Sequence, residues 1–240
     1  AQDIEKNQAS SLEDLFRNKS EVTAGGGISS GQKIYVRNIG EDALNITIDG
    51  AEQPIAVFHH SGRISIEPEL LKSVEVEAGA ANATSGPGAL GGSVRFVTKD
   101  ASDLLDDDQN IGALLKSTYS SNGDGLKNSA TVYGRTESGK VDGMLHITSG
   151  SHDNYEDGAG NEIVGSEQDE QLGFAKIKTQ LTDEQSLTLS YESMEETGDI
   201  LYRPEWIPSG GNYLRDTELL RETTTLNYRF TDQDNDLIDT

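Results

Sequence analysis

The most informative stretch of the chain runs from residue 85 to residue 99 and reads SGPGALGGSVRFVTK. Its first half holds four glycines, Gly86, Gly88, Gly91 and Gly92. Because glycine adopts positive φ angles and allows close backbone approach, we predict a tight turn here. Residues 93–98 follow as a strand. We interpret these glycines as shaping the fold and not as binding phosphate.

The residues before this turn predict a small mixed α/β unit. Residues 9–19 are expected to form a short helix, in which Ser10 and Glu13 make a capping box. A second helix, of one or two turns, should begin at Pro68 and include Leu70 and Leu71, since proline suits the first position of a helix. Short strands are expected at 34–37, 44–48 and 74–76.

The character of the chain changes after residue 100. Residues 101–109 form an acidic connector, and beyond them apolar and polar residues alternate with a period of two. We therefore divide the chain into a domain at 1–100, this connector and a strand region at 110–240. Six strands are expected there, around residues 111–120, 128–135, 141–148, 171–181, 187–192 and 225–230.

The links between these strands alternate in length. Those at 136–140 and 182–185 are short, whereas those at 150–170 and 196–218 are long and polar. Outer-membrane barrels have this alternation, and the smallest of them has eight strands, so six strands do not close one. We expect an α+β domain followed by the opening antiparallel strands of a transmembrane β-barrel, as a fragment of a barrel of about 22 strands.

Composition excludes several other classes of protein. The 240 residues carry 19 basic and 42 acidic side chains and a net charge of −23, which argues against a nucleic-acid partner. The absence of cysteine excludes disulfides, thiol catalysis and cysteine-bound zinc. No hydrolase elbow, metalloprotease helix or phosphate loop occurs, so we do not expect an enzyme.

The order of motifs at residues 34–99 resembles the plug domain of TonB-dependent outer-membrane receptors. Residues 34–37, IYVR, resemble its first strand, and residues 47–50, TIDG, its next strand and turn. Residues 66–76, IEPELLKSVEV, are similar to the helix–strand step of the family. Residues 85–99 resemble the glycine-rich turn and the closing strand. The chain departs from the family pattern at residues including 78–80, where Ala-Gly-Ala replaces the usual Arg-Gly-Pro.

The resemblance implies a receptor in the bacterial outer membrane, with its plug inside the barrel lumen and facing the periplasm. Such a receptor imports a scarce nutrient by rearranging the plug, and the expected ligand is an iron chelate, either a siderophore or haem. The implied partners are the TonB-ExbB-ExbD energy complex, the chelate and outer-membrane lipid. No intrinsic cofactor and no resident metal are expected.

Ligand binding in this family is expected at the outer apex of the plug. The apex loop holds Phe58, His59, His60 and Arg63. Imidazole ligates haem iron, and arginine pairs with anions. Because adjacent side chains seldom share one metal in an extended segment, we expect at most one histidine to be a ligand. The alternative is a polar loop with satisfied histidines.

The long outer link supplies a second group of candidate ligand contacts. Tyr202, Arg203 and Trp206 combine aromatic rings with a cation, as binding anchors often do. They are equally compatible with loop packing or with aromatic side chains at a membrane interface.

A rival interpretation comes from a different class of protein. An α/β domain followed by a soluble β-sandwich, acting as a binding or adhesion module, also produces strands with period-two patterning.

Overall fold

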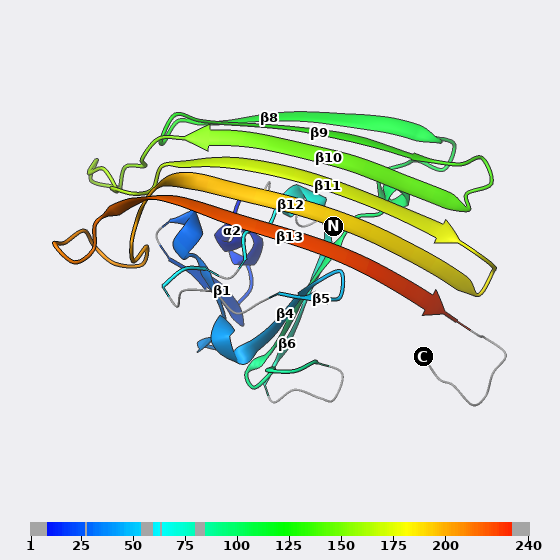
Figure 1. Ribbon diagram of the computed structural model, residues 1–240, viewed down its shortest axis with the longest axis horizontal. Coiled ribbons are helices and arrows are strands. Elements are labelled where there is room, and N and C mark those ends of the chain that lie inside the picture. Colours follow the sequence, from blue (N-terminus) through cyan, green and yellow to red (C-terminus); the bar gives the residue numbers. More distant parts are fainter. Residues whose placement is uncertain (1–8, 27, 54–59, 63, 80–84, 232–240) are drawn as a thin grey trace.

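The structure is a computed structural model that describes residues 9–26, 28–53, 60–62, 64–79 and 85–231. An N-terminal α+β domain lies beneath one broad, curved sheet of six long strands (Figure 1). Among the described residues, no helix has the length and apolar character needed to cross a membrane.

The N-terminal domain contains two small sheets. The first has the order β1-β2-β3, with bounds Val22–Gly25, Lys33–Val36 and Ile39–Gly40. The second has the order β5-β4-β7-β6, with bounds Ala51–Glu52, Leu44–Ile48, Gly92–Thr98 and Leu71–Ala78. Strands β4 and β7 pair in parallel, and β6 and β7 pair antiparallel. The helical elements are α2 (Leu12–Phe16) and the 3-10 turns η1 (Ser29–Gly31), η2 (Glu41–Ala43), η3 (Pro68–Leu70) and η4 (Ala101–Asp103).

The N-cap of the first helix lies one residue later than expected. Ser11 is the N-cap, and its Oγ accepts a hydrogen bond from Asp14 N at 3.2 Å. The Asp14 carboxylate in turn accepts from Ser10 N at 3.1 Å. The capping box predicted between Ser10 and Glu13 is therefore wrong by one position. This start places both end residues of the helix in the core, four positions apart on one face.

The turn at Pro68 is also shorter than predicted. It is the single 3-10 turn η3, and Leu71 begins strand β6 instead of continuing a helix. Leu71 is completely buried and pairs with Thr98 of β7. Strand pairing therefore outweighs the helical propensity of this segment.

The six-stranded sheet is a simple meander in the order β13-β12-β11-β10-β9-β8. All its neighbouring strands are antiparallel. A β-sandwich needs a second sheet packed on the first, and the described residues contain none there, so the rival interpretation is not supported. The bounds are Ile111–Ser120, Gly125–Arg135, Val141–His152, Gln168–Gln180, Gln185–Leu201 and Leu214–Phe230 for β8 to β13.

The outer link at 196–218 is shorter than the sequence predicts. Strands β12 and β13 stay paired from Gln185 with Phe230 as far as Leu201 with Leu214. Only residues 202–213 remain as a loop. The sequence did not predict this extension of β12 and β13 because the added residues are mostly charged and polar. A strand outside an apolar environment needs no alternation of apolar and polar residues.

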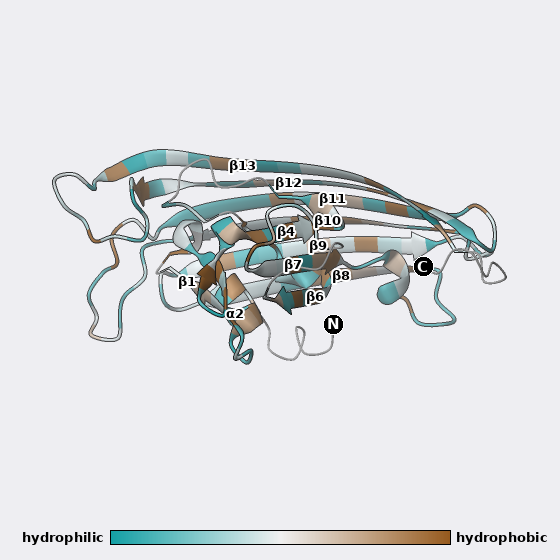
Figure 2. Cartoon of the chain, turned by 90° about the horizontal axis from the view of Figure 1, so that it is seen from below, coloured by the Kyte–Doolittle hydropathy of each residue, from teal (hydrophilic) through white to brown (hydrophobic). Residues whose placement is uncertain are grey.

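The two faces of this sheet differ in chemistry. The inner face packs on the N-terminal domain, and Met144, His146 and Thr148 of β10 are buried there. The intervening side chains point outward, so hydrophilic and hydrophobic colours alternate along the strands (Figure 2). The exposed large apolar residues of the outer face are Ile111, Leu115, Tyr119, Leu126, Val132, Leu145, Ile147, Ile177, Leu189, Tyr191, Leu220, Leu226, Tyr228 and Phe230.

The glycine-rich turn brings backbone segments together where no side chain fits. Gly92 has a φ of +134°, and a Cβ atom there would lie 2.1 Å from Glu77 O. A Cβ atom on Gly91 would lie 2.4 Å from the side chain of Ile39. The turn therefore locks β7 against β6 and β3 by close backbone approach.

A small apolar cluster joins the domain to the sheet. Leu70 and Ala101 from the domain side are buried with Met144, Leu172, Phe174 and Met194 from the sheet. The larger core lies inside the N-terminal domain around residues such as Ile34, Ile46 and Phe96, which are fully buried. Most of the remaining contact between domain and sheet is polar.

The end of β7 is held by two lysines of β11. Lys176 Nζ lies 2.9 Å from Asp100 Oδ1, 3.0 Å from Thr98 Oγ1 and 3.5 Å from Asp49 Oδ2. Lys178 Nζ lies 2.8 Å from Asp100 Oδ2. The Lys176 side chain is only 7% exposed, so these charges satisfy one another away from water.

A second group of polar contacts holds residues 65–69. Lys127 Nζ lies 2.7 Å from Glu67 Oε2, and Ser129 Oγ donates to Glu69 Oε2 at 2.7 Å. Arg221 donates to the backbone oxygen of Ser65 at 2.8 Å. The segment that enters β6 is therefore attached to strands β9 and β13 by charge-assisted hydrogen bonds.

We predict that Lys176→Met loosens the end of β7. The substitution leaves Asp49 and Asp100 buried without their shared cation, which costs about 3 kcal/mol. Amide hydrogen exchange of β7 in the intact protein should then accelerate about 100-fold. Lys178→Met is the matched control, because its side chain is 35% exposed and should cost about 1 kcal/mol or less. Equal effects of the two substitutions would contradict the burial argument.

The same cluster predicts an acid-dependent loss of stability. Burial raises the pKa of Asp100, but hydrogen bonds from Lys178 and Lys176 outweigh it and hold this pKa below its usual 3.8. Such a carboxylate stabilises the fold above the unfolded-state pKa, and the contribution disappears as the pH falls through the folded-state pKa.

Urea unfolding between about pH 6 and pH 2 checks this expectation. The Asp100→Asn variant should be less stable than the parent protein at the upper end, and the difference should shrink at the lower end. Asp107→Asn, in the exposed part of the connector, should keep the parent profile. A constant difference between parent and Asp100→Asn across the range would refute the assignment.

Candidate functional site

The candidate site lies where the loop 202–213 meets the N-terminal domain. Glu205 Oε1 of this loop is 2.6 Å from Lys33 Nζ at the start of β2. The same oxygen is 3.6 Å from Nδ1 of His60. The side chains of Lys33 and His60 are 13% and 12% exposed, so both meet Glu205 in a largely enclosed place.

An aromatic and a cationic side chain cover this contact. The Trp206 ring meets the His60 ring edge-on, with centroids 5.4 Å apart and an interplanar angle of 75°. The guanidinium of Arg203 lies 4.8 Å from the centre of the Trp206 ring. Trp206 is still 52% exposed, so part of this surface is open to a ligand. The structure therefore brings His60, Arg203 and Trp206 together, although two different parts of the chain supply them.

Tight packing on the domain fixes the loop in place. A Cβ atom on Gly31 would lie 3.1 Å from the side chain of Pro204, so a larger residue there would push the loop away by a few tenths of an ångström. The loop and the segment that precedes β2 are thus in direct contact.

A buried asparagine holds the loop in one conformation. Asn212 Oδ1 accepts from Arg203 N at 2.7 Å, and its Nδ2 lies 3.1 Å, 3.2 Å and 3.0 Å from the backbone oxygens of Arg203, Trp206 and Ile207. The residue is only 2% exposed. Tyr202, the third predicted contact, packs against the guanidinium of Arg215, which lies 4.2 Å from the centre of its ring. The loop therefore presents Glu205 and Trp206 from a preformed shape.

The remaining predicted site residues lie either outside the described part of the chain or in the glycine-rich turn. Phe58, His59 and Arg63 lie outside the described residues. Gly86 and Gly88 have φ angles of +82° and +75° and lie with Gly91 in the turn before β7, and Gly92 is the first residue of that strand.

Sequence reasoning missed three residues of this site, Lys33, Glu205 and Asn212. Glu205 and Lys33 are 172 positions apart, and a single sequence carries no signal that pairs them. A weak signal existed for Glu205, because it stands between the predicted contacts Arg203 and Trp206.

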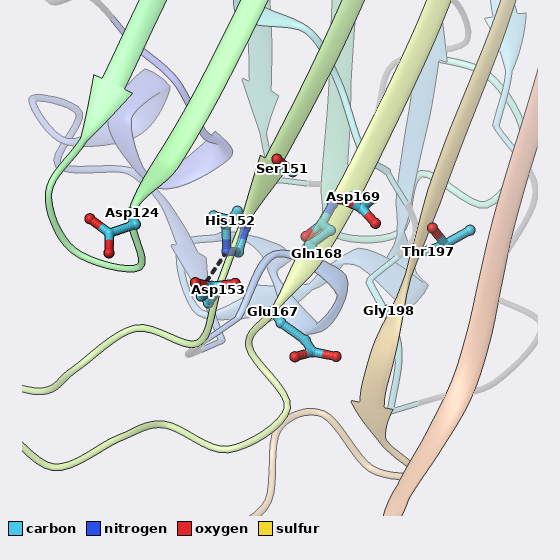
Figure 3. A pocket seen from close by; sticks show the side chains of 9 residues that line it. All are labelled: Asp124, Ser151, His152, Asp153, Glu167, Gln168, Asp169, Thr197 and Gly198. Carbon is cyan, nitrogen blue, oxygen red and sulfur yellow. Dashed lines mark hydrogen bonds between the residues drawn. The ribbon is translucent and has the colours of Figure 1, made fainter.

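A hollow with a volume of about 340 Å³ lies near the end of β10, the start of β11 and the facing part of β12 (Figure 3). Asp124, Asp153, Glu167 and Asp169 line it together with His152. His152 stacks on Tyr155 with ring centroids 4.7 Å apart. Four carboxylates around one imidazole repel an anion, and no group able to hold a metal ion occurs in the described part of the chain. The hollow is therefore a poorer site for an anionic chelate than the surface beside Trp206.

Comparison with known proteins identifies the family. Residues 1–93 match the family model described as the TonB-dependent Receptor Plug Domain. The structure as a whole superposes on the FrpB iron transporter from Neisseria meningitidis with a TM-score of 0.84 and 27% identity, over 94% of this chain and 36% of that one. The chain belongs to the TonB-dependent receptors. Its N-terminal domain is a plug, and β8 to β13 are strands of the surrounding barrel.

Two curated relatives of this TonB-dependent receptor are described as acting on haem. The Heme transporter BhuA of Brucella abortus is 34% identical over 96% of this chain and 34% of its own length. TonB-dependent heme receptor A of Haemophilus influenzae is 30% identical over 84% of this chain and 28% of its own length. The chain thus spans about a third of the length of these relatives.

We predict that Asn212→Ala loosens the loop 202–213. The change removes the buried amide that joins both ends of the loop, and each lost hydrogen bond of this kind costs about 1–3 kcal/mol. Backbone amides such as that of Arg203 should exchange at least 10-fold faster with deuterium. Asn154→Ala is the matched control, because Asn154 Oδ1 accepts from the backbone of Ser166 and Glu167 in another loop. Protection of 202–213 that survives Asn212→Ala would contradict this role.

Proposed function

We propose that the chain forms the plug and the first barrel strands of an outer-membrane receptor that imports an iron chelate, with haem as the preferred ligand. In this proposal residues 1–100 are the plug, residues 101–109 connect it to the barrel wall formed by β8 to β13, and residues 110–240 begin the barrel. The observation that carries the proposal is the meeting of His60 with Trp206 and Arg203 between the plug and an outer loop.

The chemistry of this surface suits a planar, anionic iron porphyrin. Imidazole is a common axial ligand of haem iron, and the exposed part of Trp206 offers an aromatic face. Arg203 supplies a positive charge for a carboxylate of the ligand. Both curated relatives are named for haem, which favours haem over a siderophore.

Import requires the plug to rearrange inside the barrel. We propose that the plug lies in the lumen and faces the periplasm, and that the TonB-ExbB-ExbD complex supplies the work. Ligand binding shifts the plug toward the form on which this complex acts, by as much as the ligand prefers that form. The apolar outer face of β8 to β13 contacts outer-membrane lipid. The proposed role is transport without a chemical reaction, and nucleic acid is not a partner.

The test is haem titration of the intact receptor in lipid nanodiscs, followed by the Soret band. Haem should bind and shift the band, and His60→Ala should weaken the affinity at least 10-fold and alter the band. Trp206→Ala should weaken binding to a smaller extent. His59→Ala tests the neighbouring histidine of the predicted pair, and His152→Ala, in the acidic hollow, should behave like the parent.

The titration distinguishes haem from a siderophore as the ligand. Failure to bind haem, with tight binding of a ferric siderophore, would replace haem by that chelate. Failure to bind any iron chelate would overturn the proposed function. An unchanged spectrum in His60→Ala would remove His60 from the site.

A further inference from the structure

The apolar part of the outer face ends at a different position on each strand of the six-stranded sheet. The long links at 153–167 and 202–213 lie at one end of this sheet, which we call the outer end. Going outward along each strand, the last apolar side chains before the polar outer ends are Tyr119 on β8, Leu126 on β9, Ile147 on β10, Ala175 on β11, Tyr191 on β12 and Leu226 on β13. They form the edge of an apolar belt, the set of outward-facing side chains between this edge and the short turns at 136–140 and 181–184.

The pairing register shows that this edge is inclined to the rows of directly opposed residues. Successive cross-strand pairs join Ala113 of β8 to Tyr191 of β12, and the members between them are Val132, Leu145 and Ala175. Tyr119 lies outward of Ala113 along β8 by about 20 Å, at about 3.3 Å per residue. The four strand spacings between β8 and β12 add up to about 19 Å. The edge therefore crosses the strands at about 45°, which is the tilt of β-strands that span a membrane.

Two tyrosines mark this edge and direct their hydroxyl groups away from the belt. Tyr119 donates a hydrogen bond to Asp124 Oδ1 at 2.9 Å, and Tyr191 donates to Glu222 Oε1 at 2.6 Å. Both carboxylates lie outward of their tyrosine, since Asp124 belongs to the link after β8 and Glu222 pairs with Ser193. A carboxylate is costly in hydrocarbon, whereas a tyrosine ring suits an apolar surface when its hydroxyl reaches water. The two rings therefore fit the limit of a hydrocarbon layer.

Charge changes at the same edge. Within the described strands, the outward-facing side chains of the belt are uncharged. The outer face beyond the edge carries the carboxylates Asp169, Glu195, Asp199, Asp216, Glu218 and Glu222. Leu220 stands between Glu218 and Glu222 and is 57% exposed, but a single exposed apolar side chain is ordinary on a surface in water. The belt thus suits lipid hydrocarbon, and the strand ends beyond it suit water.

We propose that the outer limit of the membrane hydrocarbon follows this inclined edge from Tyr119 on β8 to Tyr191 on β12, so that the outer parts of β12 and β13 stand outside the lipid. The inference rests on the proposed placement of the sheet in the outer membrane and not on the identity of the ligand. Between Tyr191 and Leu201, strand β12 rises about 23 Å above the hydrocarbon at this tilt. The inference also chooses between two interpretations of Trp206, which becomes part of a loop carried in water and not an anchor at the membrane interface.

The test uses nitroxide spin labels on the intact receptor in lipid nanodiscs, in a background without other reactive cysteines. Oxygen concentrates in hydrocarbon and a nickel chelate stays in water, so the collision rates of a label with each report which phase surrounds it. Every labelled position faces outward, so the labels leave the contacts between plug and sheet intact.

The deciding pair is Leu115→Cys on β8 and Ser193→Cys on β12, which lie in one cross-strand row. The label at 115 should collide mainly with oxygen, and the label at 193 mainly with the nickel chelate. The matched control pair is Ile111→Cys and Leu189→Cys, which also share a row but lie inside the belt on both strands. Both control labels should collide mainly with oxygen.

The label pattern separates this inference from the proposed function. The same phase at 115 and 193, the reverse order, or water at 189 alone would overturn the inclined boundary, while oxygen contact at 111 would still place the sheet in lipid. Water at all four positions would also overturn the proposed placement in the membrane. The predicted pattern in a receptor that binds no haem would leave the boundary in place and overturn the proposed ligand alone.

Discussion

The structure depends above all on cations that the inner face of the sheet offers to carboxylates of the plug. Lys176 and Lys178 of β11 hold Asp100, Lys127 of β9 holds Glu67, and the backbone of the same plug segment accepts a hydrogen bond from Arg221. Among the residues that the structure describes, the buried apolar contact between plug and barrel strands forms one small cluster. Buried charges persist only when they are paired, so these ion pairs fix where the plug sits on the wall.

These ion pairs explain why polar and apolar side chains alternate so regularly along the barrel strands. In β11, Lys176 and Lys178 point inward, whereas Ile177 between them is exposed on the outer face. A slip of one residue in the pairing would turn the lysines outward and place the apolar side chain against the plug carboxylates. The plug charges and the apolar outer face therefore select the same register. The ion pairs also allow a chain with a net charge of −23 to form a close interface between plug and sheet, because lysines neutralise some of its carboxylates there.

The sequence predicted those features that depend on local pattern. Strand β4 was predicted with its observed bounds, Leu44–Ile48, and six strands were expected where β8 to β13 occur. Strands β3 and β5 were missed because two residues each carry no periodicity. The helix cap was misplaced because Ser10 and Ser11 are equally good caps, and burial of the helix ends selects between them.

The sequence predicted some residues of the candidate site but not the contacts between them. His60 and Trp206 stood out by residue type, since histidine and tryptophan are rare in this chain. Their contact depends on the length of β12 and β13, which carry the loop to the plug through polar residues without a strand pattern. Lys33 and Glu205 are ordinary surface residues until the fold brings them together. Residue type therefore indicated the chemistry, and only the tertiary structure indicated its partners.

The division of the site between plug and wall has a mechanical consequence. His60 and Lys33 belong to the plug, whereas Glu205, Trp206 and Arg203 belong to a loop between barrel strands. In the proposed import mechanism, a displacement of the plug along the lumen separates the two groups, because the strands on either side of the loop are held by 17 paired positions. In that proposal, the movement that opens a path also removes the aromatic ring and the carboxylate from the histidine. The proposed mechanism thus couples binding strength to plug position by geometry, and a ligand held by both halves loses affinity as the proposed path opens.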